Sequence, residues 1–128
     1  MKLFDFITRK QSDSETYIKN YEDEVLAKKT NMYVILEIFS SAYAERFKKL
    51  NKSADNITTD QSLYDVTNGD LITTSHMVID MHEALNVKLD YLPGDEYSDF
   101  ETVGMLIQYF LDRFDYRINI ENPQMIED

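Results

Sequence analysis

Apolar side chains recur at helical spacing along most of this chain, and that pattern limits the fold more than any other feature. The 128 residues include 3 glycines and 2 prolines, too few for the many tight turns of a β-sheet protein. No segment shows a sustained alternation of apolar and polar residues. The sequence therefore predicts an all-α fold, a helical bundle of three to four helices that includes an extra N-terminal helix.

Two helices are predicted in the first fifty residues. The first spans about residues 15–29, behind a capping-box pattern formed by Ser12 and Glu15. The second spans about residues 32–50, and Thr30 or Asn31 is expected to cap it. Their apolar stripes are Tyr17, Ile18, Tyr21, Val25 and Leu26 in the first helix, and Val34, Ile35, Ile38, Phe39, Ala42, Tyr43 and Phe47 in the second.

Two more helices are predicted beyond a long polar connection over residues 51–70. The third begins near Asp70 or Leu71 and ends near Leu85, and the last spans about residues 101–114. Because the long connection carries apolar residues, we expect it to pack them onto the core. The residues expected to face inward are Met77, Val78, Met81, Ala84 and Leu85 in the third helix, and Val103, Leu106, Ile107, Phe110, Leu111 and Phe114 in the last.

This pattern divides the chain into three parts. Residues 1–30 form an N-terminal helical extension, residues 31–115 form the main helical domain, and residues 116–128 form an acidic tail. The chain has no cysteine, which excludes disulfides and thiolate metal sites. No apolar run approaches the roughly 20 residues of a membrane-spanning helix, and the start does not match a signal peptide. A cytoplasmic location is therefore expected.

The charge is strongly negative and unevenly distributed. The formal net charge is −11, with +2 in residues 1–52 and −13 in residues 53–128. Such a field repels nucleic acid and anionic lipid and attracts basic surfaces. Either solubility alone or a basic protein partner explains this acidity.

The stretch Asn68-Gly69-Asp70-Leu71-Ile72 and its surroundings resemble the attachment site of an acyl carrier protein. In that family an Asp-Ser-Leu triplet opens a helix that follows a long wrapped loop. The loop segment Ile57–Asp65 and the last-helix segments Thr102-Val103 and Ile107–Phe110 are also similar to the family's pattern. The resemblance extends from about Asn31 to Arg113 and implies an acyl-carrier-like helical bundle, whereas residues 1–30 have no counterpart in the minimal family domain.

One departure from the family concerns its chemistry. A carrier tethers phosphopantetheine through the serine hydroxyl, and Leu71 stands at that position without an atom that could form the bond. No cofactor is therefore expected. Ser75 is the weak alternative, because its use would shift the helix by one turn and misplace Met77, Val78 and Met81. We expect Thr73, Thr74 and Ser75 to serve in capping and solvation.

The remaining polar clusters favour a binding surface over a catalytic or metal site. No nucleophile–base pair or phosphate-binding glycine loop is present, so the chain is not expected to be an enzyme. His76 and His82 stand where carriers have acidic positions that partner enzymes contact. His76 shares a face with Asp80 and Glu83 that we interpret as solvated, His82 points away from it, and no metal site is expected. The acids expected to contact a partner are Asp65, Asp70, Asp80, Glu83, Asp95, Glu96 and Asp99.

Three functional hypotheses follow. The first is a non-catalytic interaction protein whose acidic surface engages a basic protein, for example as an inhibitor or immunity protein of a toxin or nuclease. The second is an acyl carrier protein with a non-standard attachment residue. The third is a lipid or small-ligand chaperone that uses the bundle core. The sequence does not identify the partner or the oligomeric state.

Overall fold

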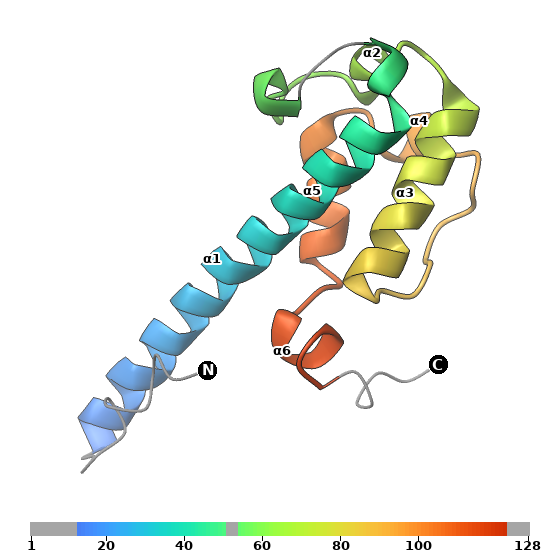
Figure 1. Ribbon diagram of the computed structural model, residues 1–128. Helices are drawn as coiled ribbons and strands as arrows, with labels where there is room; N and C mark the ends of the chain where they lie inside the picture. The colour runs from blue at the N-terminus through green and yellow to red at the C-terminus, as the bar shows by residue number, and fades with distance from the viewer. Residues whose placement is uncertain (1–12, 51–53, 123–128) are drawn as a thin grey trace.

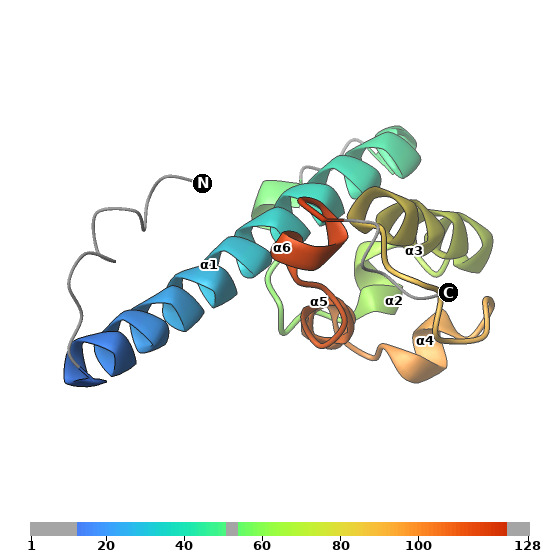
Figure 2. The same cartoon turned by 90° about the horizontal axis from the view of Figure 1, so that it is seen from below.

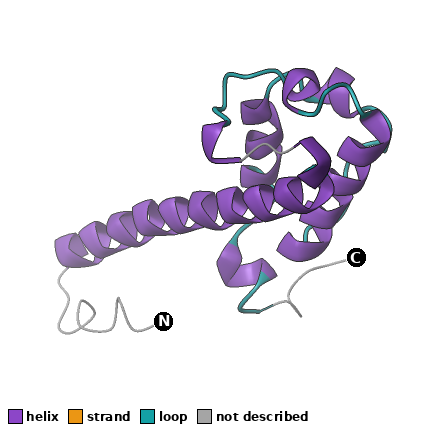
Figure 3. Cartoon of the chain, turned by 45° about the horizontal axis from the view of Figure 1, so that its top comes forward, coloured by secondary structure: helices purple, strands orange, loops and turns teal. Residues whose placement is uncertain are grey.

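The computed structural model describes residues 13–50 and 54–122, without the side chains of residues 13–20. In chain order its elements are α1 (Asp13–Arg46), two 3-10 turns (Lys48–Leu50 and Ala54–Asn56), α2 (Leu63–Val66), α3 (Leu71–Leu85), α4 (Glu96–Asp99), α5 (Val103–Leu111) and α6 (Tyr116–Asn119). The described residues contain no strand, only an isolated antiparallel bridge between Ser62 and Thr102. Helices joined by loops account for the whole architecture (Figure 3), which confirms the predicted all-α bundle.

Helix α1 is one continuous helix of 34 residues (Figure 1). The prediction of a helix break near Thr30 and Asn31 was wrong, because both side chains bind elsewhere. Thr30 Oγ1 donates to the carbonyl of Leu26, one turn back, at 2.9 Å. Asn31 Oδ1 accepts from the backbone N–H of Tyr116, 85 residues along the chain, at 2.9 Å. The predicted capping residue Ser12 lies outside the described residues.

The core forms where the C-terminal half of α1 packs against α3 and α5 (Figures 1 and 2). The rings of Phe39, Tyr43 and Phe47 stack in a row along α1, with centroid distances of 6.0 and 5.0 Å. Predicted inward-facing residues that are buried include Ile35, Met77, Val78, Met81, Leu85, Val103, Leu106, Ile107, Phe110 and Phe114. Ala84 is exposed, so its predicted inward orientation was wrong.

The long connection before α3 packs onto this core, as predicted. Leu63 and Val66 of α2 are buried. The buried hydroxyl of Tyr43 donates to the carbonyl of Val66 at 2.7 Å, which ties the connection to α1. The N–H of Leu63 donates to the carbonyl of Glu101 at 3.1 Å, which ties it to the segment before α5. The residues that lead into α3 are therefore fixed from two sides.

Helix α6 lies beside the middle of α1 and begins at Tyr116, inside the segment predicted as an acidic tail. Two asparagines hold its end against the end of α3. Asn86 Nδ2 donates to the carbonyl of Asn119 at 3.0 Å, and Asn119 Nδ2 donates to the carbonyl of Asn86 at 2.8 Å. The predicted tail residues 123–128 lie outside the described residues.

A buried histidine joins α3 to α5. His82 Nδ1 lies 2.9 Å from the carbonyl of Val78, so that nitrogen carries the proton, and Nε2 then accepts from the hydroxyl of Tyr109 at 2.8 Å. The same hydroxyl accepts from the N–H of Asp90 at 3.0 Å. His82 is buried, so the comparison of this position with an exposed, partner-contacting acid was wrong. Burial, together with the charge of Arg113, lowers the pKa of His82 below its usual value.

This lowered pKa predicts an acid-sensitive fold. Above about pH 6.5 histidine is neutral in both the folded and unfolded chain; below it the unfolded chain binds the proton more readily, so stability is lost as pH falls. His82→Gln is expected to flatten the dependence of melting temperature on pH between about 7.5 and 5. His76→Gln, a control at an exposed histidine, is expected to keep the wild-type slope. Equal slopes for wild type and His82→Gln would contradict this account.

Candidate functional site: the start of helix α3

A turn of two residues with positive φ leads the chain into α3. Asn68 has φ 57° and Gly69 has φ 68°, a conformation that glycine adopts without steric cost. A Cβ atom on Gly69 would lie 2.7 Å from Cζ of Tyr64, so a side chain here would also displace the exposed Tyr64 ring. The Asn-Gly pair therefore sets the direction in which the helix begins.

Asp70 caps α3, as the sequence predicted. Its Oδ1 accepts from the N–H of Thr73 at 3.1 Å, and its Oδ2 accepts from the hydroxyl of Thr73 at 2.8 Å. The backbone hydrogen bond from Thr73, followed by that from its hydroxyl, lowers the pKa of the Asp70 carboxyl. Asp70 stays charged at the positive end of the helix dipole, where it stabilises the first turn.

Leu71 and Ile72 are the first two residues of α3, and both are exposed to solvent. Leu71 is 37% exposed and Ile72 is 73% exposed. Neither side chain carries a heteroatom, so the outer surface of this helix start is apolar and chemically inert. A ring of Tyr64, also exposed, lies beside the turn.

The three hydroxyls that follow in α3 are not equivalent. Thr73 is engaged by Asp70, as described above. Thr74 is buried, and its hydroxyl lies 3.0 Å from the hydroxyl of Tyr97. Ser75 is half-buried on the second turn. Within the first turn of α3 only Leu71 and Ile72 are exposed, because Thr73 is half-buried and Thr74 is buried.

Tyr97 contacts several of the elements around the start of α3. Its hydroxyl bonds to Thr74 of α3 and to Thr67, which follows α2. Its ring lies edge-on to Tyr64 of α2, with centroids 5.1 Å apart. Helices α2, α3 and α4 therefore meet here; α2 carries the exposed acid Asp65, α4 carries Asp99, and Asp70 caps α3. These three acids and the exposed pair Leu71 and Ile72 form what we call the α3-start surface.

The other predicted partner-contacting acids lie in different surroundings. Asp80 is half-buried and binds Arg46 of α1 through two hydrogen bonds, of 2.6 and 3.0 Å. Glu83 is exposed but lies near the opposite end of α3, and Asp95 is half-buried at the start of α4. The structure thus brings together only part of the predicted set.

Glu96 is fully buried and does not reach the surface. Its carboxylate accepts from the hydroxyl of Tyr91 and, at 3.1 Å, from the N–H of Gly94. Burial, followed by the hydrogen bond to Glu96, raises the pKa of Tyr91 above its usual range. Glu96 therefore holds the loop before α4 in place, a role that the sequence did not reveal.

A groove between the end of α1 and the start of α3 was missed by the sequence analysis. It has a volume of about 630 Å³, and its lining includes the cations Arg46, Lys48 and Lys49 and the acids Glu45 and Asp70, with Lys48 bound to Glu45 at 3.1 Å. The sequence showed these cations as the end of a helix, where they complement the helix dipole. It could not show that the end of α1 and the start of α3 meet.

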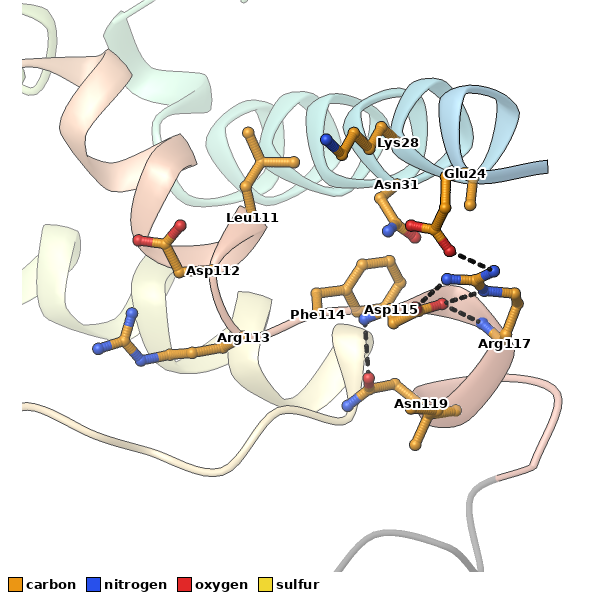
Figure 4. A pocket seen from close by; sticks show the side chains of 12 residues that line it. Glu24, Lys28, Asn31, Leu111, Asp112, Arg113, Phe114, Asp115, Arg117 and Asn119 are labelled. Atoms are coloured by element: carbon orange, nitrogen blue, oxygen red, sulfur yellow. Dashed lines mark hydrogen bonds and ion pairs between the residues drawn. The ribbon is translucent and has the colours of Figure 1, made fainter. Parts of the chain in front are cut away.

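A second groove lies between α1 and α6 (Figure 4). Its volume is about 480 Å³, and Arg117 bridges it by binding Asp115 at 2.6 Å and Glu24 of α1 at 3.5 Å. Arg117 lowers the pKa of the Asp115 carboxyl through this hydrogen bond. The ion pair between Arg117 and Glu24 thus links α6 to α1 at this groove.

Two searches of the described part of the chain gave negative results. No group of three or more His, Cys, Asp or Glu side chains in residues 13–50 and 54–122 could hold a metal ion. No helix within the same residues is long and apolar enough to cross a membrane.

Comparison with known proteins identifies the family. The acyl carrier proteins of two strains of Borreliella burgdorferi, ZS7 and ATCC 35210 / DSM 4680 / CIP 102532 / B31, are each 31% identical to this chain over 77 residues. That match covers 60% of this chain and 92% of each relative. The chain belongs to the acyl carrier protein family. No protein-family model matches the chain, and no solved structure matches it significantly.

Membership of the acyl carrier protein family accounts for about three fifths of the chain. The match extends over almost the full length of each relative, so two fifths of this chain lie beyond it. The α1–α3–α5 core with its capped α3 is the all-α arrangement that the resemblance implied.

The Asn68–Gly69 turn predicts a sharp effect of substitution. Gly69→Ala is expected to lower the free energy of unfolding by about 1–2 kcal/mol, since an L-residue is strained at this φ, and to displace the Tyr64 ring. Urea unfolding would measure the combined loss of stability from the strained backbone and from the displaced Tyr64 ring. In a Tyr64→Ala background the same substitution is expected to cost less, because only the backbone strain is left. An unchanged unfolding midpoint for Gly69→Ala would contradict the proposed role of this turn.

Proposed function

We propose that this acyl carrier protein family member is a non-catalytic interaction module that has lost the prosthetic-group serine. Leu71 occupies the serine position at the first residue of α3, and Ile72 follows it as the apolar residue of the triplet. The observation that carries the proposal is the state of the nearby hydroxyls: Thr73 is bound to Asp70 and Thr74 is buried. Ser75, half-buried on the second turn, is the attachment residue of the alternative hypothesis.

A labelling experiment tests the loss of the attachment site. The full chain is incubated with a phosphopantetheinyl transferase and coenzyme A, and its intact mass is measured. We expect no mass increase for the wild type, because Leu71 has no nucleophilic atom. Leu71→Ser is expected to gain one phosphopantetheine. Ile72→Ser, which places a more exposed hydroxyl one residue further on, is the matched control and is expected to stay unlabelled.

Two other outcomes of the labelling experiment would contradict the proposal. A labelled wild type with the group on Ser75 would establish the alternative, an acyl carrier protein with a non-standard attachment residue. An unlabelled Leu71→Ser variant that folds normally would mean that the frame around Leu71 is not a carrier site.

The partner is proposed to be a basic protein. The net charge of −11 and the exposed acids Asp65, Asp70 and Asp99 beside an apolar pair suit a surface that is guided electrostatically and anchored by Leu71 and Ile72. An inhibitor or immunity protein that blocks a basic toxin or nuclease is the concrete form of this proposal.

Binding kinetics with basic proteins encoded beside this gene test the partner proposal. Asp65→Asn with Asp99→Asn is expected to slow association by about tenfold at low salt, because both charges flank the apolar pair. The matched control is Glu37→Gln with Glu121→Gln, which removes the same charge from exposed positions elsewhere. Equal slowing by both pairs would show that net charge alone attracts the partner, and would contradict a site at the α3 start.

A further inference from the structure

Helix α1 carries exposed apolar side chains that the bundle leaves uncovered. Among its described side chains Ala27 is the first that is buried, and the preceding turns extend beyond the bundle, joined to it by the ion pair of Glu24 with Arg117 (Figures 1 and 2). Tyr21 is 65% exposed, Val25 36%, Met32 37% and Leu36 40%.

These four residues lie on one side of α1. With 3.6 residues per turn they fall within a sector about 60° wide and about 22 Å long. We call this sector the α1 stripe. The same sector continues toward the C-terminus of α1 through Phe39 and Tyr43, which the bundle buries. A row of large apolar side chains on a projecting helix is typical of a helix–helix contact.

Charged residues beside the α1 stripe can form ion pairs between two copies of the chain. Glu22 and Lys29 are both exposed and lie seven residues apart on the same flank of the stripe. When two copies of one helix pair in opposite directions, equivalent flanks face each other. A crossing near residue 26 therefore places Glu22 of each copy beside Lys29 of the other, and Tyr21 within a turn of the other copy's Met32.

We propose that α1 pairs in antiparallel fashion with α1 of a second copy of this chain, through the α1 stripe. The bundle sits at one end of α1 (Figure 2), so antiparallel pairing puts the two bundles at opposite ends, whereas parallel pairing brings them to the same end. The α3-start surface lies on the bundle, outside this contact. The pairing is therefore independent of the proposed partner binding, and a test can contradict one proposal without contradicting the other.

A contact centred near residue 26 that includes Tyr21, Val25 and Met32 extends over about two heptads and leaves Leu36 at its edge, so the dimer is expected to be moderate in affinity and concentration-dependent. Sedimentation velocity of the full chain over a range of concentrations is expected to show a monomer–dimer equilibrium. Val25→Glu with Met32→Glu is expected to leave only monomer, because it places two like charges in the apolar contact. Ser41→Glu with Ala44→Glu adds the same charge to exposed positions of α1 outside the stripe and is expected to keep the dimer.

Circular dichroism and melting temperature would show that both variants fold. A wild type that is monomeric at every concentration would overturn the proposal, including the case in which residues 1–12 of the same chain cover the stripe. Dimers that survive Val25→Glu with Met32→Glu would also overturn it, because they would form through another surface.

The absence of cysteine makes the direction of pairing testable by disulfide formation. Val25→Cys lies near the crossing point and is expected to link to itself under mild oxidation. Met32→Cys alone is not expected to link, since its two copies are separated by about 18 Å along the helices, far beyond disulfide reach. Mixed Tyr21→Cys and Met32→Cys chains are expected to link to each other. Self-linking by Met32→Cys would indicate parallel pairing and overturn the proposed arrangement.

Discussion

The packing of α1 against α3 and α5 is the constraint on which the other features depend. The stacked rings of Phe39, Tyr43 and Phe47 give α1 its buried face, and the Tyr43 hydroxyl then fixes the carbonyl of Val66. A connection held at that point leaves the Asn68–Gly69 turn little freedom, so the start of α3 is positioned by a residue that is distant in the chain. The site is therefore a consequence of the core, and core substitutions are expected to disturb it before they unfold the chain.

The features that sequence analysis found are those set by local interactions. The start and end of α3 were predictable because Asp70 and Asn86 act on residues within one turn of themselves. Inward-facing positions were predictable because burial follows the helical period. The helix break that was wrongly predicted at Asn31 has a non-local cause, because the Asn31 side chain binds Tyr116, 85 residues away. An amide that would cap an isolated helix here joins two helices instead, and a single sequence does not reveal such a distant partner.

The same distinction applies to the acidic residues. Their number was visible in the sequence, but the structure divides them by surroundings. Arg46 binds Asp80 across 34 residues, and packing encloses Glu96 beside Tyr91. An enclosed carboxylate costs free energy unless hydrogen bonds compensate it, which is why Glu96 has two donors close by. Charge counts therefore overestimate the acidic surface, and Asp65, Asp70 and Asp99 are exposed acids on the elements that meet around Tyr97.

The frame around Leu71 is held entirely by other residues. Gly69 sets the turn, Asp70 caps the helix through Thr73, and Tyr97 joins α2, α3 and α4, whereas Leu71 extends toward solvent. Leu71 is only 37% exposed and Ile72 is 73% exposed, so the two side chains present a partly covered apolar pair at the first turn of the helix. Under the proposed loss of the prosthetic group, this pair stands where a carrier has its attachment point. An apolar pair at a fixed helix start is the physical basis of the proposed binding role.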